Sequence, residues 1–565
     1  MHIAIQCLEL LFGRGDDDYP FWVLTIRLNV LVFLVCAAFI IRWHASPGRR
    51  RKVPPAVWWT VAGLTVLAAV LRFGVARPNL VDFGGIPYSR LLYGYKGYFA
   101  TAQFFSPLYQ LTARDIEHGI LFQRIAGTLT IPLVYGLCRR FDTKAFPAIA
   151  AFLFAVYPLH ILFSASDSLS VFTTFLAASS YLILAGAVGL EDPSSYAQKL
   201  RGTGRIARLH YLGGLSGLAL LTQVRPESAL LLIPPALALA AQWRALRLRE
   251  LLAPLAVAAA FMTIYAYYAA TAGVAHQNPG DVQRALNLTI HHIALNPFMA
   301  IPALLFATAA IAVYRSVGLA VLALLPWVAV FVLCVSTIED GHGAARLYAN
   351  WLILILPFAG YGLSLMWNAP RRIGRFAGAV ALVYFGSLPL ITADRLTAQH
   401  LEIVEHDRFR DLLAKLPSGV QRIIVPDDDL MWRQYHSTLE LYRKYAAIFS
   451  TRSEAARQLQ LLGLTEYLEN PERTSCAEGA CVFFFGIPCM DQSIYAVTRG
   501  QCEALVRDHR TSLLDETAVV TAPFVACSIY SGELKRQLCD PATMPRRFRL
   551  YRVEEGDRLS VIGDR

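Results

Sequence analysis

The feature that most constrains this chain is a change of composition at about residue 392. Before it, apolar stretches of about 20 residues recur, and each is long enough to cross the ~30 Å hydrocarbon core of a bilayer as a helix. After it, the chain turns polar and holds six of the ten cysteines. The sequence therefore predicts an α-helical polytopic membrane domain over 1–393 and a second domain over 394–565.

Hydropathy predicts twelve membrane spans. Of all residues, 55% are hydrophobic and only 16% are charged, which is far from the mix of a soluble domain. The expected spans cover about 22–42, 55–75, 119–138, 145–163, 168–190, 209–223, 228–242, 251–272, 297–314, 317–335, 347–367 and 374–393. The lipid bilayer is thus the solvent for most of the chain.

Lysine and arginine collect in the loops after odd-numbered spans, and short basic loops stay in the cytoplasm. These loops lie at 42–52, 139–144, 199–208, 244–249 and 371–375. The tail and the loops after even-numbered spans are therefore expected in the periplasm. The expected membrane is a bacterial inner (plasma) membrane, with an endoplasmic reticulum membrane as the alternative. The cytoplasmic loops explain most of the net charge of +11, so no nucleic-acid partner is expected.

The tail is expected to be a small α/β domain with disulfides. Its cysteines are Cys476, Cys481, Cys489, Cys502, Cys527 and Cys539. Their even number and the lack of a C-x-x-C pair favour three disulfides over zinc, although the 15 possible pairings all stay open. Strand-like runs lie at 420–425, 481–487 and 548–553, and a helical run lies at 430–447. The four cysteines of the membrane part are expected to be packing residues or free thiols.

The outside loop 76–118 is the first candidate for a functional site, because a loop of about 40 residues is much longer than a helix connection needs. It holds a carboxylate, cations and aromatic rings: Asp82, Tyr88, Arg90, Tyr93, Lys96 and Tyr109. Such groups at a membrane surface suit an amphiphile with an anionic head. The alternative is that Asp82 caps a helix or is solvated, and that the tyrosines are ordinary interfacial residues.

Three shorter outside loops place more polar residues close to the membrane. Asp167 lies in 164–168, Arg225 and Glu227 lie in 224–228, and His342, Arg346 and Tyr348 lie in 338–348. Each loop also has a simpler interpretation, as a helix cap, an ion pair that pins a hairpin, or a snorkelling cation. The loop at 273–296 holds adjacent histidines without a clear carboxylate partner, which is weak support for a metal site.

The acid-bearing first loop is accompanied by an ordered series of short stretches, some within the spans and some in the loops. They are 106–109 (SPLY), 123–127 (QRIAG), 139–141 (RRF), 157–160 (YPLH), 164–167 (SASD), 221–227 (LTQVRPE) and 346–348 (RLY). In this order, over about 70–370, the chain resembles the GT-C superfamily of membrane glycosyltransferases, in particular the family 39 type that includes protein O-mannosyltransferases and lipid A aminoarabinose transferases. It departs from that family where Asp82 is followed by Phe83-Gly84-Gly85 instead of a second acid.

The resemblance implies a polyprenyl-phosphate sugar as donor and an inverting transfer of a hexosyl or pentosyl group to the hydroxyl of a lipid, glycan or protein. Asp82 is then the general base, and Asp167 orients the acceptor or holds a divalent metal ion together with Asp82. No other cofactor is implied. The residues expected at the donor phosphate are Arg346, Arg225, Lys96, Arg90 and Tyr348. Those expected at the substrates are Tyr88, Tyr93, Tyr109, Glu227 and His342.

Two other classes stay open from the sequence. A transporter or flippase of lipid-linked sugars also has many spans and intramembrane arginines, although no internal repeat is evident and the polar residues collect in outside loops. A catalytically silent relative that acts as a scaffold is the other. A cavity at the outer face where Asp82 and Arg346 converge would favour the enzyme, and a cavity at the midplane would favour transport.

Overall fold

A computed structural model shows that the chain divides after Ala398 into two compact units, named here the helical unit and the tail unit. The structure describes residues 20–45, 53–78, 116–142, 144–166, 168–188, 204–224, 226–241, 248–271, 286, 290, 296, 298–337, 341–398, 404–405, 408–409, 411–412, 415–417, 419–427, 460–469, 480–490, 496–508, 511–518 and 547–553. Of these, residues 20–24, 116–119, 188, 204–205, 226–227, 263–271, 335–337, 341–344, 346, 496–497 and 508 are described by their backbone alone.

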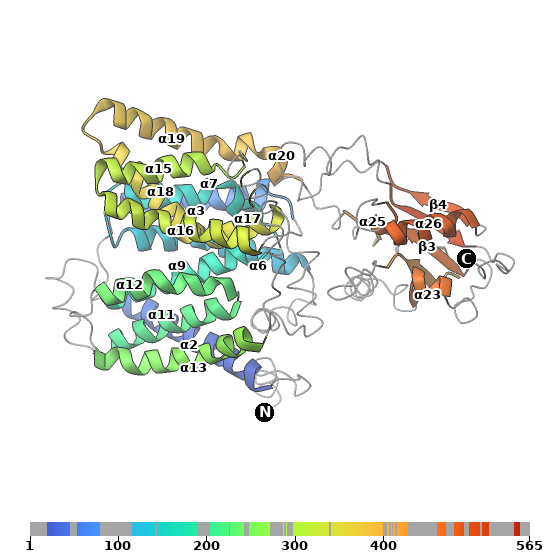
Figure 1. Ribbon diagram of the computed structural model, residues 1–565, viewed down its shortest axis with the longest axis horizontal. Helices are drawn as coiled ribbons and strands as arrows, with labels where there is room; N and C mark the ends of the chain where they lie inside the picture. The colour runs from blue at the N-terminus through green and yellow to red at the C-terminus, as the bar shows by residue number, and fades with distance from the viewer. Residues whose placement is uncertain are drawn as a thin grey trace. The chain divides into compact units, whose positions relative to one another are not determined.

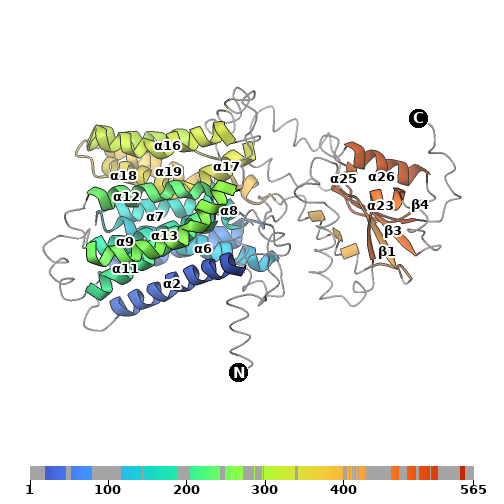
Figure 2. The ribbon, with the colours of Figure 1, turned by 60° about the horizontal axis from the view of Figure 1, so that its bottom comes forward.

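The helical unit is a set of long helices that lie side by side along a common direction (Figures 1 and 2). They are α2 (Pro20–Ala45), α3 (Pro55–Ala69) continued by the π-helix η2 (Val70–Val75), α6 (Ile116–Cys138), α7 (Phe146–Val156), α8 (Pro158–Ser164), α9 (Ser170–Val188), α11 (Gly204–Val224), the 3-10 helix η4 (Pro226–Leu232), α12 (Ile233–Ala241), α13 (Leu248–Thr271), α15 (Ile301–Tyr314), α16 (Val317–Thr337), α17 (Gly341–Asn350), α18 (Leu352–Trp367), α19 (Arg372–Ile391) and α20 (Ala393–Leu396). Each expected span is found as one helix or as two consecutive helices.

These helices make the chain a multi-pass membrane protein by length and composition. Within the described residues, six helices are long and apolar enough to cross a membrane, and the bent pair of α7 and α8 makes a seventh. The outward side chains of α16 include Val321, Leu325 and Val328, which are more than half exposed. Exposed aliphatic side chains on a helix of this length are stable when lipid replaces water around them. The prediction of an α-helical polytopic domain is confirmed.

Close contact between helices depends on glycine at particular positions. A Cβ atom on Gly362 in α18 would lie 1.7 Å from the backbone oxygen of Ala307 in α15, so no larger residue fits there without a backbone shift. Lipid tails are as apolar as leucine, so helices in a bilayer associate through such close packing rather than through the hydrophobic effect. The α15–α18 contact therefore requires the small residue.

The tail unit is built on a five-stranded mixed sheet with the strand order β2-β1-β3-β5-β4. The strands are β1 (Arg422–Val425), β2 (Gln460–Gly463), β3 (Cys481–Phe485), β4 (Thr511–Glu516) and β5 (Arg549–Val553), and the helices are α23 (Leu464–Glu469), α25 (Ile487–Met490) and α26 (Ala496–Asp508). Strand β1 pairs in parallel with β2 and β3, whereas β5 pairs antiparallel with β3 and β4. The expected α/β class is confirmed; the expected helix at 430–447 lies outside the described residues.

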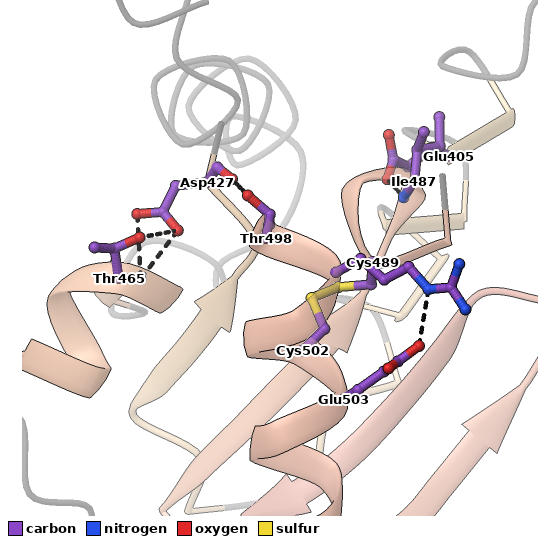
Figure 3. Close-up of a disulfide and its surroundings, with 9 residues drawn as sticks. Glu405, Asp427, Thr465, Ile487, Cys489, Thr498, Cys502 and Glu503 are labelled. Atoms are coloured by element: carbon purple, nitrogen blue, oxygen red, sulfur yellow. Dashed lines mark hydrogen bonds and ion pairs between the residues drawn. A yellow bond between two sulfur atoms is a disulfide. The ribbon is translucent and has the colours of Figure 1, made fainter. Parts of the chain in front are cut away.

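A disulfide joins Cys489 in α25 to Cys502 in α26 and bridges 13 positions of sequence (Figure 3). Cys481 is also disulfide-bonded. The other tail cysteines, at 476, 527 and 539, lie outside the described residues, as does Cys7. In the helical unit Cys36, Cys138 and Cys334 are buried and form no disulfide, in agreement with the expectation from the sequence.

Carboxylates hold the parallel strands of the tail unit to its helices. Asp427, two residues after β1, accepts hydrogen bonds from the backbone N–H and the hydroxyl of Thr465 in α23, each at 3.0 Å (Figure 3). Thr498 of α26 donates to the backbone carbonyl of Asp427 at 2.8 Å. Glu405 is buried and accepts the backbone N–H of Ile487 at 2.5 Å. These hydrogen bonds thus tie α23 and α26 to the segment after β1, and α25 to the segment that holds Glu405.

Candidate functional site

Polar side chains gather at the end of the helical unit that holds η2, α8, α17 and α20, named here the Arg72 end. Helix α8 contacts η2, α6, α17 and α20. Figure 1 shows α17 and α20, and Figure 2 shows α8 and α17, at one end of the long helices. The backbone connections follow from the order of the spans: a chain that crosses repeatedly brings every second loop to the same end. The Arg72 end is therefore where the expected outside loops begin and finish.

Arg72 of η2 lies at the centre of this end and is completely buried. Its guanidinium donates to the carbonyl of Phe154 at 2.9 Å and to that of Ala155 at 3.2 Å. It also donates to Ser164 Oγ at 3.1 Å and to His160 Nδ1 at 2.6 Å, and within its own helix to the carbonyl of Ala68. All of these partners are neutral. One cation thus joins two spans through four hydrogen bonds.

The sequence explains why these carbonyls need a donor. Pro158 has no backbone N–H, so the carbonyl of Phe154, four residues before it, cannot make its helical hydrogen bond. The axis bends by 57° between α7 and α8 at this point, which separates the next carbonyl, that of Ala155, from the ladder as well. A carbonyl in the hydrocarbon region cannot accept a hydrogen bond from water, because the bilayer core holds none. Arg72, from the neighbouring span, supplies both hydrogen bonds.

The same contact sets the tautomer of His160. An arginine can only donate, so Nδ1 of His160 must accept, and the ring proton then lies on Nε2. The side chain is 1% exposed, and its Nε2 has no hydrogen-bond partner among the described residues. The ring packs edge-on against Phe154, with the ring centroids 5.4 Å apart. His160 is therefore a neutral imidazole whose orientation is set by Arg72.

A turn of buried serines follows α8. Ser164 Oγ donates to the carbonyl of His160 at 2.6 Å, and Ser166 Oγ donates to the carbonyl of Phe163 at 2.9 Å. Ser166 Oγ also accepts the backbone N–H of Ser168 at 3.1 Å. Asp167 itself lies outside the described residues, but the residues on both sides of it are placed by these bonds. The turn thus has a defined backbone entry and exit around Asp167.

Glycine in α6 lets this turn approach closely. A Cβ atom on Gly127 would lie 2.2 Å from Ser164 Oγ and 3.1 Å from Val171 of α9. Gly127 belongs to the stretch at 123–127 that the sequence analysis singled out. Any side chain at this position would displace the end of α8, so the contact between α6 and α8 requires glycine.

The loop that carries Asp82 also starts at the Arg72 end. Its last described anchors are the carbonyl of Ala76, which accepts Arg124 Nη2 at 2.9 Å, and the backbone N–H of Arg77, which donates to the carbonyl of Leu396 at 3.0 Å. Asp82 lies outside the described residues, five positions after Arg77, a reach of about 18 Å for a fully extended chain. Both acid-bearing segments therefore leave the bundle from the surroundings of Arg72.

Tyr348 is the one predicted site residue whose side chain the structure describes. It belongs to α17 and is 1% exposed. Its hydroxyl lies 3.3 Å from that of Tyr157, which also donates to the backbone carbonyl of Met299. The ring centroid of Trp327 lies 5.7 Å away. Tyr348 therefore packs inside the bundle, and its role at a donor phosphate stays a prediction.

The other predicted site residues fall outside the side chains that the structure describes. Those wholly outside the described residues are Asp82, Tyr88, Arg90, Tyr93, Lys96, Tyr109, Asp167 and Arg225. Those described by backbone only are Glu227 in η4, and His342 and Arg346 in α17. Within the described part of the chain, no three His, Cys, Asp or Glu side chains are grouped as metal ligands.

Sequence reasoning missed the polar groups that the tertiary structure brings together. Arg72 and His160 are 88 positions apart, and only the presence of an arginine inside an apolar span could have drawn attention to the first. Near Tyr348, both amide atoms of Asn350 and the indole nitrogen of Trp351 are buried without a hydrogen-bond partner among the described residues. Buried polar groups of this kind are uncommon in proteins and often mark bound water or ligand.

Comparisons with known proteins find likeness only at the level of solved structures. No protein-family model matches the chain, and no curated protein matches its sequence. ArnT from Cupriavidus metallidurans bound to undecaprenyl phosphate is 14% identical over 76% of this chain and 93% of that one, with a TM-score of 0.42. An oligosaccharyltransferase from Archaeoglobus fulgidus is 12% identical over 66% of this chain, with a TM-score of 0.38. This chain covers 62% of that enzyme. Likenesses of this degree establish neither family nor activity.

Proposed function

We propose that this protein is a GT-C-type membrane glycosyltransferase that moves a sugar from a polyprenyl-phosphate donor to an acceptor hydroxyl. The observation that carries the proposal is the joint origin of two acid-bearing segments at the Arg72 end. Arg72 bonds directly to Ser164, three residues before Asp167, and the loop of Asp82 begins five residues after Arg72, at Arg77. An amphiphilic donor needs its polar head beside an apolar bundle, and both acid-bearing segments leave the bundle at this end.

Transfer would proceed by one displacement at the anomeric carbon. Asp82 accepts the proton of the acceptor hydroxyl while that oxygen forms the new glycosidic bond. The bond from the anomeric carbon to the phosphate oxygen breaks, and its electron pair leaves with the polyprenyl phosphate. General base catalysis of this kind contributes about 10²–10⁴ in rate. Attack opposite the leaving group inverts the configuration.

The leaving phosphate departs without a proton if cations take up its charge, and such electrostatic stabilisation is often the largest single contribution. Arg346 on α17 is the first candidate, followed by Arg225, Lys96 and Arg90. Helix α17 contacts α8, so its residues begin close to the serine turn. Tyr348, four-fifths of the way along α17, supports this helix from inside the bundle.

Asp167 would orient the acceptor hydroxyl at the serine turn. Two carboxylates also suit a divalent cation such as Mg²⁺. The displacement described above requires no metal, so no step is assigned to one. The tyrosines of the first loop, with Glu227 and His342, would contact the sugar and the acceptor.

The finer assignments follow from the same proposal. The family 39 type, a hexosyl or pentosyl donor, and a lipid, glycan or protein acceptor are the expected class. The bacterial inner membrane is the expected location, with the tail unit in the periplasm as an oxidising compartment. The Cys489–Cys502 disulfide supports this side of the membrane, because disulfides persist in oxidising compartments.

The decisive test is sugar transfer from a panel of radiolabelled polyprenyl-phosphate sugars in isolated membranes that carry the full chain and supply the acceptor hydroxyls. We expect transfer by the native chain and loss of at least ~10² in rate for Asp82→Asn. Asp142→Asn is the matched control, since Asp142 follows α6 at the opposite end of the bundle and accepts the N–H of Lys144. Equal transfer by native chain and Asp82→Asn would remove Asp82 from the mechanism. Movement of labelled donor across the bilayer without transfer would favour a flippase.

A further inference from the structure

Arg72 makes hydrogen bonds on both sides of the break between α7 and α8. On the α7 side it holds the carbonyls of Phe154 and Ala155, and on the α8 side it holds His160 and Ser164. Because both helices are bonded to one rigid, planar guanidinium, α8 cannot rotate freely against α7 about the bend at Tyr157-Pro158. The angle between α7 and α8 is therefore set by a residue of a different span.

Stability alone is a poor reason for this arrangement. Burial of a cation without a charged partner is unfavourable, and even buried ion pairs can often be replaced by apolar residues without loss of stability. A proline-free span would also need no donor at Phe154 and Ala155. The chain instead combines a break, a serine turn at its end and a buried arginine that spans the break. Such polar groups inside a membrane generally have a function.

We propose that Arg72 is a positioning residue: it sets the direction of α8 and, through it, the placement of the serine turn that carries Asp167. This inference rests on the proposed function. Ser164 is the last residue of α8 and a direct partner of Arg72, so any rotation of α8 moves the turn with it. A displacement of about 1 Å at a reacting group can lower a rate by 10²-fold.

His160 is the second fixed point of α8 in this arrangement. Asparagine can offer its Oδ1 near the position of Nδ1 and keep the hydrogen bond from Arg72, whereas glutamine places its amide near Nε2 instead. We expect His160→Asn to retain more transfer than His160→Gln. The opposite order would show that the N–H on Nε2, and not the bond to Arg72, is what matters at this position.

Replacement of Arg72 is best combined with repair of the break. Arg72→Leu leaves two carbonyls without donors, so the thermal midpoint should fall, and transfer per folded molecule should fall by about 10²-fold. Pro158→Ala gives residue 158 a backbone N–H that can donate to the carbonyl of Phe154, and it allows α7 and α8 to run as one helix. In the double variant we expect the thermal midpoint to recover but transfer to stay low, because α8 then points elsewhere.

The controls separate this inference from the proposed function. Asp142→Asn, at the opposite end of the bundle, is again the matched control, and near-native transfer is expected. Hydrogen exchange at 159–170 needs no substrate and should be faster in Arg72→Leu, where the break stays unrepaired. Recovery of transfer together with the thermal midpoint in the double variant would make Arg72 merely stabilising, and unchanged exchange would also overturn the proposal. Absence of transfer by the native chain with altered exchange would instead count against the proposed function alone.

Discussion

In the helical unit the buried cation Arg72 is held by carbonyls, a hydroxyl and an imidazole, whereas in the tail unit carboxylates hold backbone N–H groups. Asp427 accepts the N–H of Thr465 in α23, Glu405 accepts the N–H of Ile487 in α25, and Glu516 accepts hydrogen bonds from two arginines. The chemical problem is the same in both units, since a backbone group at the end of an element needs a partner.

The solutions differ because the surroundings differ. A group freed by a break in a membrane span can reach only another span, so the partner must be rigid and close, and helices must pack tightly around it. A group at the surface of the tail unit can also turn to water when its partner is removed. We therefore expect substitutions to be more damaging in the helical unit than in the tail unit at similar contacts.

The largest effect is expected from Gly362→Ala. The added methyl would lie 1.7 Å from the carbonyl of Ala307, so α15 and α18 must separate, with a loss of about 3 kcal/mol or more of stability. Thermal unfolding in detergent measures it. Gly63→Ala is the control, because nothing lies within 4 Å of a Cβ there. In the tail unit, Gly500→Ala in α26 should instead stabilise by up to ~1 kcal/mol, since its surroundings are also open. Equal changes in stability at Gly362 and Gly500 would contradict the expectation that substitutions are more damaging in the helical unit than in the tail unit.

Loss of the tail disulfide comes next. Cys489→Ser with Cys502→Ser should destabilise the tail unit by about 3 kcal/mol, as expected for a closed loop of this length. Hydrogen exchange in peptides from α25 and α26 measures it, and exchange in the helical unit should not change. Cys138→Ala, which alters a buried free thiol, is the control. An effect that spreads to the helices would show that the two units are not independent in stability.

A smaller effect is expected from Asp427→Ala. It removes the acceptor of two hydrogen bonds from Thr465 and should destabilise the tail unit by about 1 kcal/mol. Asp427→Asn keeps an acceptor oxygen and should have less effect. Denaturant unfolding of the full chain, followed by circular dichroism, measures the difference in stability between the two variants. A loss as large as that of Gly362→Ala would contradict the assumption that water replaces the carboxylate.

The smallest effect is expected on acidification of the tail unit. Hydrogen bonds from Arg549 and Arg547 hold the pKa of Glu516 below its ordinary value of 4.5. The unfolded chain then binds the proton first, so this contribution to stability is complete above pH 4.5 and is lost as pH falls through the lower folded pKa. Glu516→Gln should flatten the fall slightly in a pH series of unfolding midpoints. A variant with the native slope would remove this ion pair from the stability of the tail.

Prediction from sequence succeeded where a property is local. Hydropathy located the spans, and alternation in short apolar runs located β1, β3 and β5. It missed β2, in which only Leu461 and Leu462 are apolar, and β4, whose exposed Leu513 hides the pattern. The pairing of Cys489 with Cys502 was one of the open possibilities, because neighbours in space need not be neighbours in sequence.

The sequence by itself determined that this chain crosses a membrane many times and ends in a cysteine-rich α/β unit, since hydrophobicity and its period depend only on nearby residues. Only the tertiary structure decided that Arg72 lies on the break at Pro158, in hydrogen-bond contact with His160 and Ser164. The physical reason is that carbonyls freed by proline inside a bilayer must find a donor on another span, and the packing of the whole bundle chooses which one.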